Sequence, residues 1–244
     1  MALSADTTLL ASGGLDSLVV LWDVPSGSVI RKFHLHDGII TSVSVNRDRS
    51  LLASGSSDKK VVVFDLVNNT IAYTLADFTS EITCVKFSPD GQLLAVASLD
   101  KEITLYDATH GQLLAQLEGH KSRVRDLSFN PNSSVLHSCG DDSRVIVWDI
   151  KKKENIKIEK TKKYGSEWLL SVDAQNDFQG SAVAGLDLKV YVTTNFGTTV
   201  GKIDMTVNRI KFLPSIGGVL KLAVATRGKG VYIMDTMQFE SQKQ

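Results

Sequence analysis

The sequence predicts an all-β protein made of repeated four-stranded units, and two observations carry this prediction. First, an aromatic residue followed by Asp recurs every 42 residues, as Trp22-Asp23, Phe64-Asp65, Tyr106-Asp107 and Trp148-Asp149. Second, short alternating apolar runs separated by polar turns fill each interval, which is the pattern of strands joined by hairpins. A period of about 40–45 residues with four short strands per repeat is typical of the blades of a β-propeller.

The period continues to the end of the chain with weaker marks. Thr193-Thr194 and Met234-Asp235 stand where the aromatic-Asp pair is expected, so the last two intervals are 45 and 41 residues. We therefore expect a single domain over 1–244, a β-propeller of about six four-stranded blades. The repeats are expected at about 1–33, 34–75, 76–117, 118–160, 161–203 and 204–244.

Both ends of the predicted array are incomplete. Met1 aligns with a position inside the inner strand of a blade, and only Thr236–Gln244 is left for a final outer strand. Three arrangements follow: a six-bladed ring, part of a seven-bladed ring, or an open ring that another chain completes. An open ring exposes strands that pair readily with other chains, so we expect marginal solubility or self-association and, with a partner strand, a higher melting temperature.

The strands themselves can be placed by alternation between turn residues. In the first repeat they are expected at Leu9–Ser12, Leu18–Trp22 and Val29–Phe33. In repeats two to four the inner strands are expected at Thr41–Val45, Ile82–Phe87 and Val124–Phe129, the second strands at Leu51–Gly55, Leu93–Ser98 and Val135–Cys139, and the third at Val61–Phe64, Ile103–Tyr106 and Val145–Trp148. The last two repeats predict Trp168–Asp173, Ser181–Gly185, Lys189–Val192, Val207–Phe212, Leu220–Thr226 and Val231–Met234. We expect nearly continuous apolar inner strands, because neighbouring blades cover both of their faces.

Composition excludes several classes of protein. The 27 basic and 27 acidic residues give a net charge of zero, whereas dedicated nucleic-acid binders usually carry a basic excess. No apolar run approaches the roughly 18 residues needed to span a membrane, and the N-terminus does not resemble a signal peptide. The two cysteines, Cys84 and Cys139, lie in separate predicted strands, which predicts reduced thiols and a cytoplasmic or nuclear location.

The fourth repeat, Glu118–Ile150, is the most complete one. It begins with Gly119-His120, contains two alternating runs, and ends with Trp148-Asp149. In these features the chain resembles the WD-repeat (WD40) family over nearly its whole length, and Gln112–Asp126 is similar to the small WD-repeat subunit of the superkiller RNA-decay complex. The resemblance implies a non-catalytic scaffold that mediates protein–protein interactions in a multi-protein complex.

His120, Ser138 and Asp142 are the residue types of a hydrolase triad. The resemblance implies instead that they form, with Trp148, a buried hydrogen-bonded tetrad: Asp142 holds His120, His120 engages Ser138, and Ser138 accepts from the Trp148 indole. A triad also needs an exposed nucleophile and an oxyanion hole, so we expect no catalytic residue. The five histidines are scattered along the chain, so we expect no metal site, and no cofactor.

The resemblance also implies where proteins or peptides would bind. In such propellers the loop leading into the inner strand and the loop before the repeat's Asp open on the same narrow face. Two sets of equivalent residues are expected there: Ile39, Glu81, Arg123 and Trp168 at the lead-in position, and Leu15, Ser57, Leu99, Asp141, Leu186 and Arg227 at the pre-Asp position. Trp168 and Arg123 are of the types most enriched in interface hot spots. The competing interpretation places Trp168 in the wall of the central channel.

A lysine-rich segment, Lys151–Lys163, allows a second interpretation of function. Its alternation Asn155–Glu159 predicts an outer edge strand, and lysines on such a strand discourage pairing with other chains. The alternative is contact with nucleic acid or another anionic ligand, as part of an RNA-processing or decay assembly. A further alternative is a partner that donates a strand or blade at the open ends.

Overall fold

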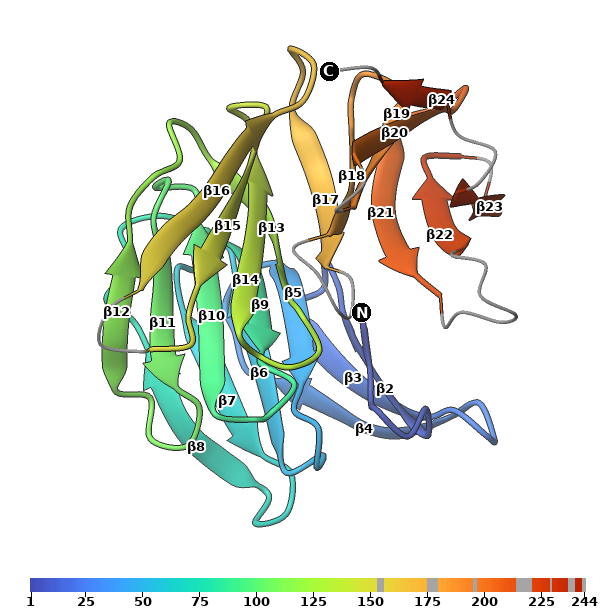
Figure 1. Cartoon of the computed structure of the whole chain (residues 1–244). Coiled ribbons are helices and arrows are strands. Elements are labelled where there is room, and N and C mark those ends of the chain that lie inside the picture. The colour runs from blue at the N-terminus through green and yellow to red at the C-terminus, as the bar shows by residue number, and fades with distance from the viewer. Residues whose placement is uncertain are drawn as a thin grey trace. The chain divides into compact units, whose positions relative to one another are not determined.

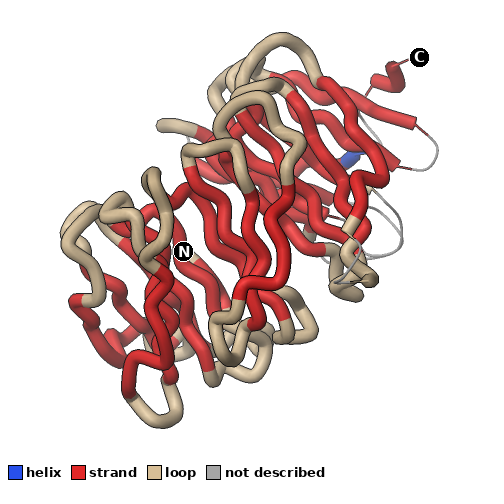
Figure 2. Tube along the Cα trace, turned by 90° about the vertical axis from the view of Figure 1, so that its left-hand side faces the viewer, coloured by secondary structure: helices blue, strands red, loops and turns tan. Residues whose placement is uncertain are grey.

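A computed structural model describes residues 1–152, 156–174, 180–194, 197–213, 221–228, 230–236 and 240–242 of the chain. They form antiparallel β-sheets whose successive strands are joined by short turns (Figures 1 and 2). The chain divides into two compact units, Met1–Glu118 and Gly119–Gln244, within one residue of a predicted repeat boundary. Each unit holds three blades, and the all-β propeller class predicted from the period is confirmed.

The first unit contains three four-stranded sheets, β1–β4, β5–β8 and β9–β12. Their strands are β1 (Ala2–Leu3), β2 (Leu9–Gly13), β3 (Leu18–Asp23), β4 (Ser28–His34), β5 (Ile40–Val45), β6 (Leu51–Ser56), β7 (Val61–Asp65), β8 (Thr70–Leu75), β9 (Ile82–Phe87), β10 (Leu93–Ser98), β11 (Ile103–Asp107) and β12 (Leu113–Leu117). The expected strands match these to within about a residue at each end. As expected, the first inner strand is short: β1 pairs with β2 through two residues only.

The core of the first unit lies between adjacent sheets. Val61, Val63, Ile82 and Val85 belong to one buried cluster that joins the second and third blades. The close approach of β9 depends on Gly55, because a Cβ there would lie 2.5 Å from Ile82 Cγ2. Close packing of this kind leaves little tolerance for added volume, so the sheets of this unit can stack in one way.

The inner strands differ from the expectation of nearly continuous apolar residues. Polar side chains alternate with apolar ones, and they bond to the inner strand of the next blade: Ser42 Oγ accepts from Val85 N–H at 3.1 Å, and Ser44 Oγ accepts from Phe87 N–H at 3.1 Å. An inner strand is the edge of its sheet, so half of its N–H groups have no partner within the sheet. The serines of the preceding blade supply that partner, which an apolar residue cannot do.

The second unit contains sheets β13–β16, β17–β20 with β24 added, and β21–β23. Its strands are β13 (Val124–Phe129), β14 (Val135–Gly140), β15 (Arg144–Asp149), β16 (Lys157–Lys163), β17 (Leu169–Ala174), β18 (Ser181–Gly185), β19 (Lys189–Thr194), β20 (Gly197–Lys202), β21 (Val207–Phe212), β22 (Lys221–Thr226), β23 (Gly230–Asp235) and β24 (Glu240–Gln242). Among the residues that the structure describes, no helix is long and apolar enough to cross a membrane.

Two outer strands of this unit differ from the prediction. The lysine-rich strand expected over Asn155–Glu159 is found at Lys157–Lys163, and residues 153–155 lie outside the described part of the chain. The segment expected to complete the last blade contains β24, but β24 pairs with β20 of the preceding blade instead of with β23. Residues 237–239 of the same expected strand lie outside the described residues. Within the described chain the last sheet therefore ends at β23.

Candidate partner-binding face

The two predicted sets of face residues meet in pairs at one end of the second, third, fourth and fifth blades. In each pair the N–H of the pre-Asp residue donates to the C=O of the lead-in residue, at 2.9–3.0 Å: Ser57 to Ile39, Leu99 to Glu81, Asp141 to Arg123, and Leu186 to Trp168. In the last blade Arg227 donates to Thr206 in the same way, at 3.0 Å. An irregularity in register near this end of the inner-to-second strand pairing turns the lead-in loop toward its neighbour.

In the first unit this end of the blades exposes apolar side chains. Leu15 is 82% exposed and Ile39 is 42% exposed. Ser57 supports Ile39 a second time, since its hydroxyl accepts from the Ile39 N–H at 2.9 Å. Glu81 is exposed and Leu99 is half-buried. The loops are therefore held firmly by backbone bonds while their side chains stay open to solvent.

In the second unit the predicted Trp168 carries the most organised arrangement. Trp168 is 45% exposed. The Arg125 guanidinium lies over the indole ring, 5.1 Å from its centre. The same guanidinium donates from Nε and Nη2 to the two carboxylate oxygens of Asp141, at 2.6 and 2.9 Å. Asp141, Arg125 and Trp168 thus form a stack whose outer member is an indole.

Arg125 was not among the residues predicted from the sequence. The prediction selected Arg123, which is exposed and holds the loop through its carbonyl. The available signal was the alternation of β13, which places residues two apart on the same side of the strand. The same alternation places Arg125 beyond the loop, next to the following blade. Its contact with Trp168 depends on where that blade places the indole, which the sequence does not show.

The predicted tetrad residues lie together in the fourth blade. His120 Nδ1 lies 3.0 Å from Asp142 Oδ2, His120 Nε2 lies 2.7 Å from Ser138 Oγ, and Trp148 Nε1 donates to that oxygen at 2.9 Å. Burial acts to raise the pKa of Asp142, but its hydrogen bonds with His120 and with the Lys121 N–H outweigh this, so the pKa is lowered. Ser138 is fully buried, so its hydroxyl is closed to a substrate.

Other blades contain parts of the same network. In the second blade His36 lies 2.9 Å from Asp58 and 2.8 Å from Ser54, and Phe64 replaces the indole. In the first blade the Trp22 indole donates to Ser12 at 2.8 Å. The fifth blade uses different residue types, for example a Tyr191 hydroxyl that donates to Asp187 at 2.5 Å.

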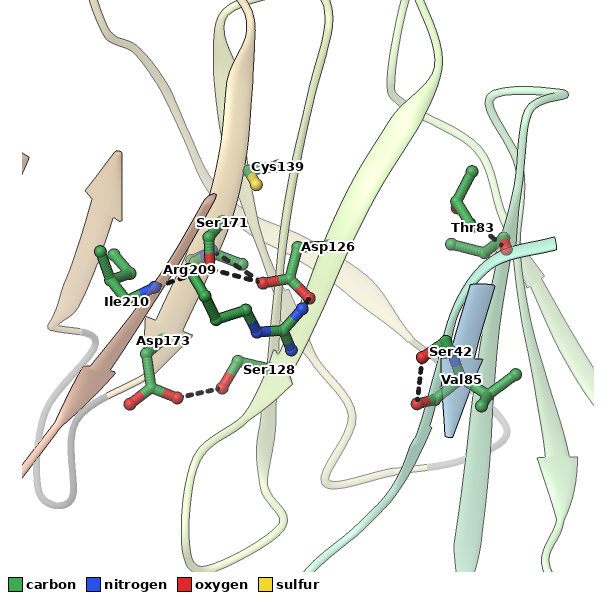
Figure 3. A network of polar contacts seen from close by, with 12 residues as sticks. Ser42, Thr83, Val85, Asp126, Ser128, Cys139, Ser171, Asp173, Arg209 and Ile210 are labelled. Carbon is green, nitrogen blue, oxygen red and sulfur yellow. Dashed lines mark hydrogen bonds and ion pairs between the residues drawn. The ribbon is translucent and has the colours of Figure 1, made fainter. Parts of the chain in front are cut away.

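A second polar network, missed in the sequence, joins the inner strands of the second unit (Figure 3). Asp126 is fully buried; its carboxylate accepts from the Ser171 hydroxyl at 2.9 Å and the Val172 N–H at 3.1 Å, and pairs with Arg209 at 3.1 Å. Asp173 accepts from Ser128 at 3.1 Å and from Lys211 at 2.8 Å.

The network of the second unit does what the serines do in the first unit. It supplies acceptors to the N–H groups of the next inner strand, here with charged partners added. Charge-assisted hydrogen bonds are shorter and stronger than neutral ones, so these carboxylates hold adjacent inner strands firmly together. The signal in the sequence was the interruption of the apolar runs by Asp126 and Asp173.

The lysine-rich strand β16 gathers three lysines on one face. An irregularity between Val147 and Trp148 leaves Glu159 as an extra residue, so that Lys157, Lys160 and Lys162 all stand opposite residues of one face of β15. Lys162 bends inward, donating to the Thr198 hydroxyl with its ammonium 5.4 Å from the Tyr164 ring. Burial and the charge of Lys160 lower the pKa of Lys162.

The described residues contain no group of three or more side chains suited to holding a metal ion. Cys84 and Cys139 are both buried, and neither is in a disulfide within the described chain. What this end of the blades offers chemically is a set of rigid loops with exposed apolar and aromatic side chains. Such surfaces recognise other molecules by burial and shape.

Comparison with known proteins gives one family. The model of the echinoderm microtubule-associated protein second β-propeller matches residues 1–170, which is more than half of the chain. No curated protein matches the sequence.

Proposed function

Because the chain belongs to the echinoderm microtubule-associated protein second β-propeller family, we propose that it is a non-catalytic scaffold in a multi-protein complex and that it holds a protein partner at Trp168. Propellers of this WD40 type are generally protein-interaction scaffolds without catalytic activity. The finer statement, that this chain binds through the second unit and through that residue, rests on the geometry around the indole.

The single observation that carries the proposal is the stack of Asp141, Arg125 and Trp168. A large aromatic ring that is 45% exposed would ordinarily be mobile, yet this one is held from below by a guanidinium at 5.1 Å. Binding costs less conformational entropy when the anchor is already fixed in its bound orientation. Trp and Arg are also the residues that most often dominate interface energies.

The stack also indicates what the partner presents. Asp141 neutralises the charge of Arg125 within the stack, so the contact surface is the indole together with Leu186, whose side chain is 36% exposed. Aromatic and aliphatic groups gain most from covering such a surface. We therefore expect the partner to insert an apolar or aromatic side chain.

The test is affinity capture of partners from native extract with the intact chain and with Trp168→Ala, followed by mass spectrometry. We expect the variant to lose its main partner by at least about tenfold, since truncating a hot-spot residue costs about 2 kcal/mol or more. Ile158→Ala is the matched control, because its side chain is 46% exposed but lies on β16. An unchanged set of partners with Trp168→Ala would rule out this site.

The lysine face of β16 supports a second candidate, contact with nucleic acid or another anionic ligand in an RNA-processing or decay assembly. Lys157, Lys160 and Lys162 share one face of the strand, although Lys162 is already engaged with Thr198. The same capture experiment separates the two candidates. If the retained material is nucleic acid, released steeply by salt and lost when Lys157 and Lys160 become Gln, the second candidate is correct.

A further inference from the structure

The third blade contains a cavity at the place where the fourth blade has its tetrad. It has a volume of about 170 Å³ and is lined by residues from the lead-in loop, the end of β10, the turn before β11, β11 and β12. They are Asp77, Phe78, Thr79, Ser98, Asp100, Glu102, Thr104, Tyr106, Leu113 and Gln116. A cavity of about 150 Å³ in another protein accommodates benzene, so this one has room for the end of a side chain.

The cavity exists because the third blade has smaller or polar residues at positions where the fourth blade has closely packed ones. There, Gly119 lies against Trp148 and Ile146, and a Cβ at Gly119 would be only 3.0 Å from Trp148 Cη2. By the 42-residue period, the third blade has Asp77, Tyr106 and Thr104 at these three positions. The tetrad His is Phe78 in this blade, so the polar network that closes the fourth blade is absent here.

The lining carries negative charge without a matching cation. Asp100 accepts from the Thr79 and Ser80 hydroxyls, but the side chains of Asp77 and Glu102 make no hydrogen bond or ion pair within the described residues. Among the described residues no Lys, Arg or His lines the cavity, and Lys101, between two of the acids in sequence, is not part of the lining. The site is therefore electrostatically complementary to a cation.

Two aromatic rings form part of the lining. Phe78 and Tyr106 are arranged edge to face, with ring centres 6.4 Å apart. Burial and the neighbouring Asp77 carboxylate raise the pKa of the Tyr106 hydroxyl, against an opposing effect of the Thr104 hydroxyl. Aromatic faces attract cations, and rings combined with carboxylates are the usual means of recognising an ammonium group.

One buried polar atom in the lining also points to a ligand. The residue Thr104 is only 8% exposed, and within the described part of the chain its Oγ1 has no hydrogen-bond partner of ordinary geometry. A buried hydroxyl without a partner is unfavourable, whereas the isoleucine at the equivalent position of the fourth blade has no such cost. A ligand that donates a hydrogen bond would remove this cost.

We propose that this cavity of the third blade binds the cationic side chain of a lysine or arginine in a partner protein. Asp77 and Glu102 would balance the charge, Phe78 and Tyr106 would contact the alkyl chain and the cation, and Thr104 would accept a hydrogen bond. That the cationic side chain belongs to a protein rests on the proposed scaffold function. The cavity and Trp168 involve different residues, so the test of the cavity and the test of Trp168 can fail independently.

The test titrates the isotope-labelled intact chain with four small probes and follows the amide resonances of the third blade. N-acetyl-lysine amide, its trimethylated form and N-acetyl-arginine amide are the cationic probes, and N-acetyl-norleucine amide is the neutral one. We expect the cations to shift the resonances of Thr104, Tyr106 and Gln116, and the neutral probe to leave them unchanged. The order of affinity among the three cations distinguishes lysine, methylated lysine and arginine.

Variants connect the binding to the cavity. The double change Asp77→Asn and Glu102→Gln is expected to weaken binding roughly fivefold, because two exposed ion pairs contribute modestly. Thr104→Ile should reduce binding by filling the cavity while the melting temperature is kept or raised. Asp37→Asn, which removes a carboxylate that is 86% exposed and outside the cavity, and Trp168→Ala should both bind like the parent chain. Equal shifts with norleucine amide, or unchanged binding by the double variant, would overturn the proposal.

Discussion

At the scale of single residues, His137 is a buried histidine whose loss of solvation is not offset by hydrogen bonds to its ring within the described chain. It is 0% exposed, and neither ring nitrogen has a hydrogen-bond partner among the residues that the structure describes. The positions equivalent to it in the other blades are all alanine: Ala11, Ala53, Ala95, Ala182 and Ala223. Burial alone lowers the pKa of His137 to about 4, whereas the other buried histidines, His36 and His120, each face an aspartate.

We predict that His137 makes the protein acid-sensitive. The unfolded chain binds a proton on this residue near pH 6.5, but the folded chain does not until about pH 4. The free energy of unfolding therefore falls as the pH is lowered between these values, by about 2 kcal/mol from pH 7 to pH 5. Urea unfolding at the two pH values should show that His137→Ala removes most of this difference. His110→Ala, whose side chain is 72% exposed, should keep it, and equal pH slopes for His137→Ala and the parent would contradict the prediction.

At the scale of elements, few polar anchors join the strands of a blade, and the fourth blade has the fullest set. Its tetrad connects the lead-in loop through His120, the second strand through Ser138 and the third strand through Trp148. A buried network in which every member is bonded specifies one arrangement of the strands. The second blade lacks only the indole, yet its His36–Ser54 distance, 2.8 Å, is close to the 2.7 Å of the fourth blade.

We predict that the tetrad contributes to stability and not to catalysis. His120→Ala should lower the free energy of unfolding by about 2–3 kcal/mol, because it leaves Ser138 and Asp142 without a partner in a buried site. Trp148→Phe should cost about 1 kcal/mol, since the second blade already tolerates Phe64 at that position. Chemical denaturation measures both changes. Hydrolase activity that is lost with Ser138→Ala at an unchanged melting temperature would refute this role.

At the scale of the whole molecule, charge offers no general protection against association. The chain has no net charge at pH 7, and charge repulsion between copies is therefore weak. β23, the outermost described strand of the last sheet, exposes three consecutive apolar residues: Val231 is 66% exposed, Tyr232 is 43% exposed and Ile233 is 59% exposed. The outer strand β16 differs, because lysines occupy it, and charged edge strands resist pairing with other chains.

We predict that the isolated chain self-associates through β23. Ile233→Lys should reduce the fraction of dimers and larger species in sedimentation experiments at pH 7, because it gives β23 the charged edge that β16 already has. Val67→Lys is the control, since that side chain is 75% exposed but lies in a turn of the first unit. A parent chain that sediments as a monomer at all concentrations would contradict the prediction.

The sequence by itself determined the fold class and the positions of the inner, second and third strands, whereas it predicted no residue range for the outer strands β8, β12 and β20. The reason is that both signals are local: alternation identifies a strand within five or six residues, and the 42-residue period relates one blade to the next. The members of the tetrad could also be named, because the resemblance to WD-repeat blades implies roles for those positions of the fourth repeat.

Only the tertiary structure decided which side chains meet across blades and along outer edges. Arg125 rather than Arg123 supports Trp168 because of how β13 lies beside the next blade. Three lysines share a face of β16 because one extra residue shifts the register, and β24 pairs with β20 because an outer edge accepts any strand that reaches it. The cavity beside Thr104 has the same origin. These features depend on register and on residues far apart in the chain, and neither is recorded in a local pattern.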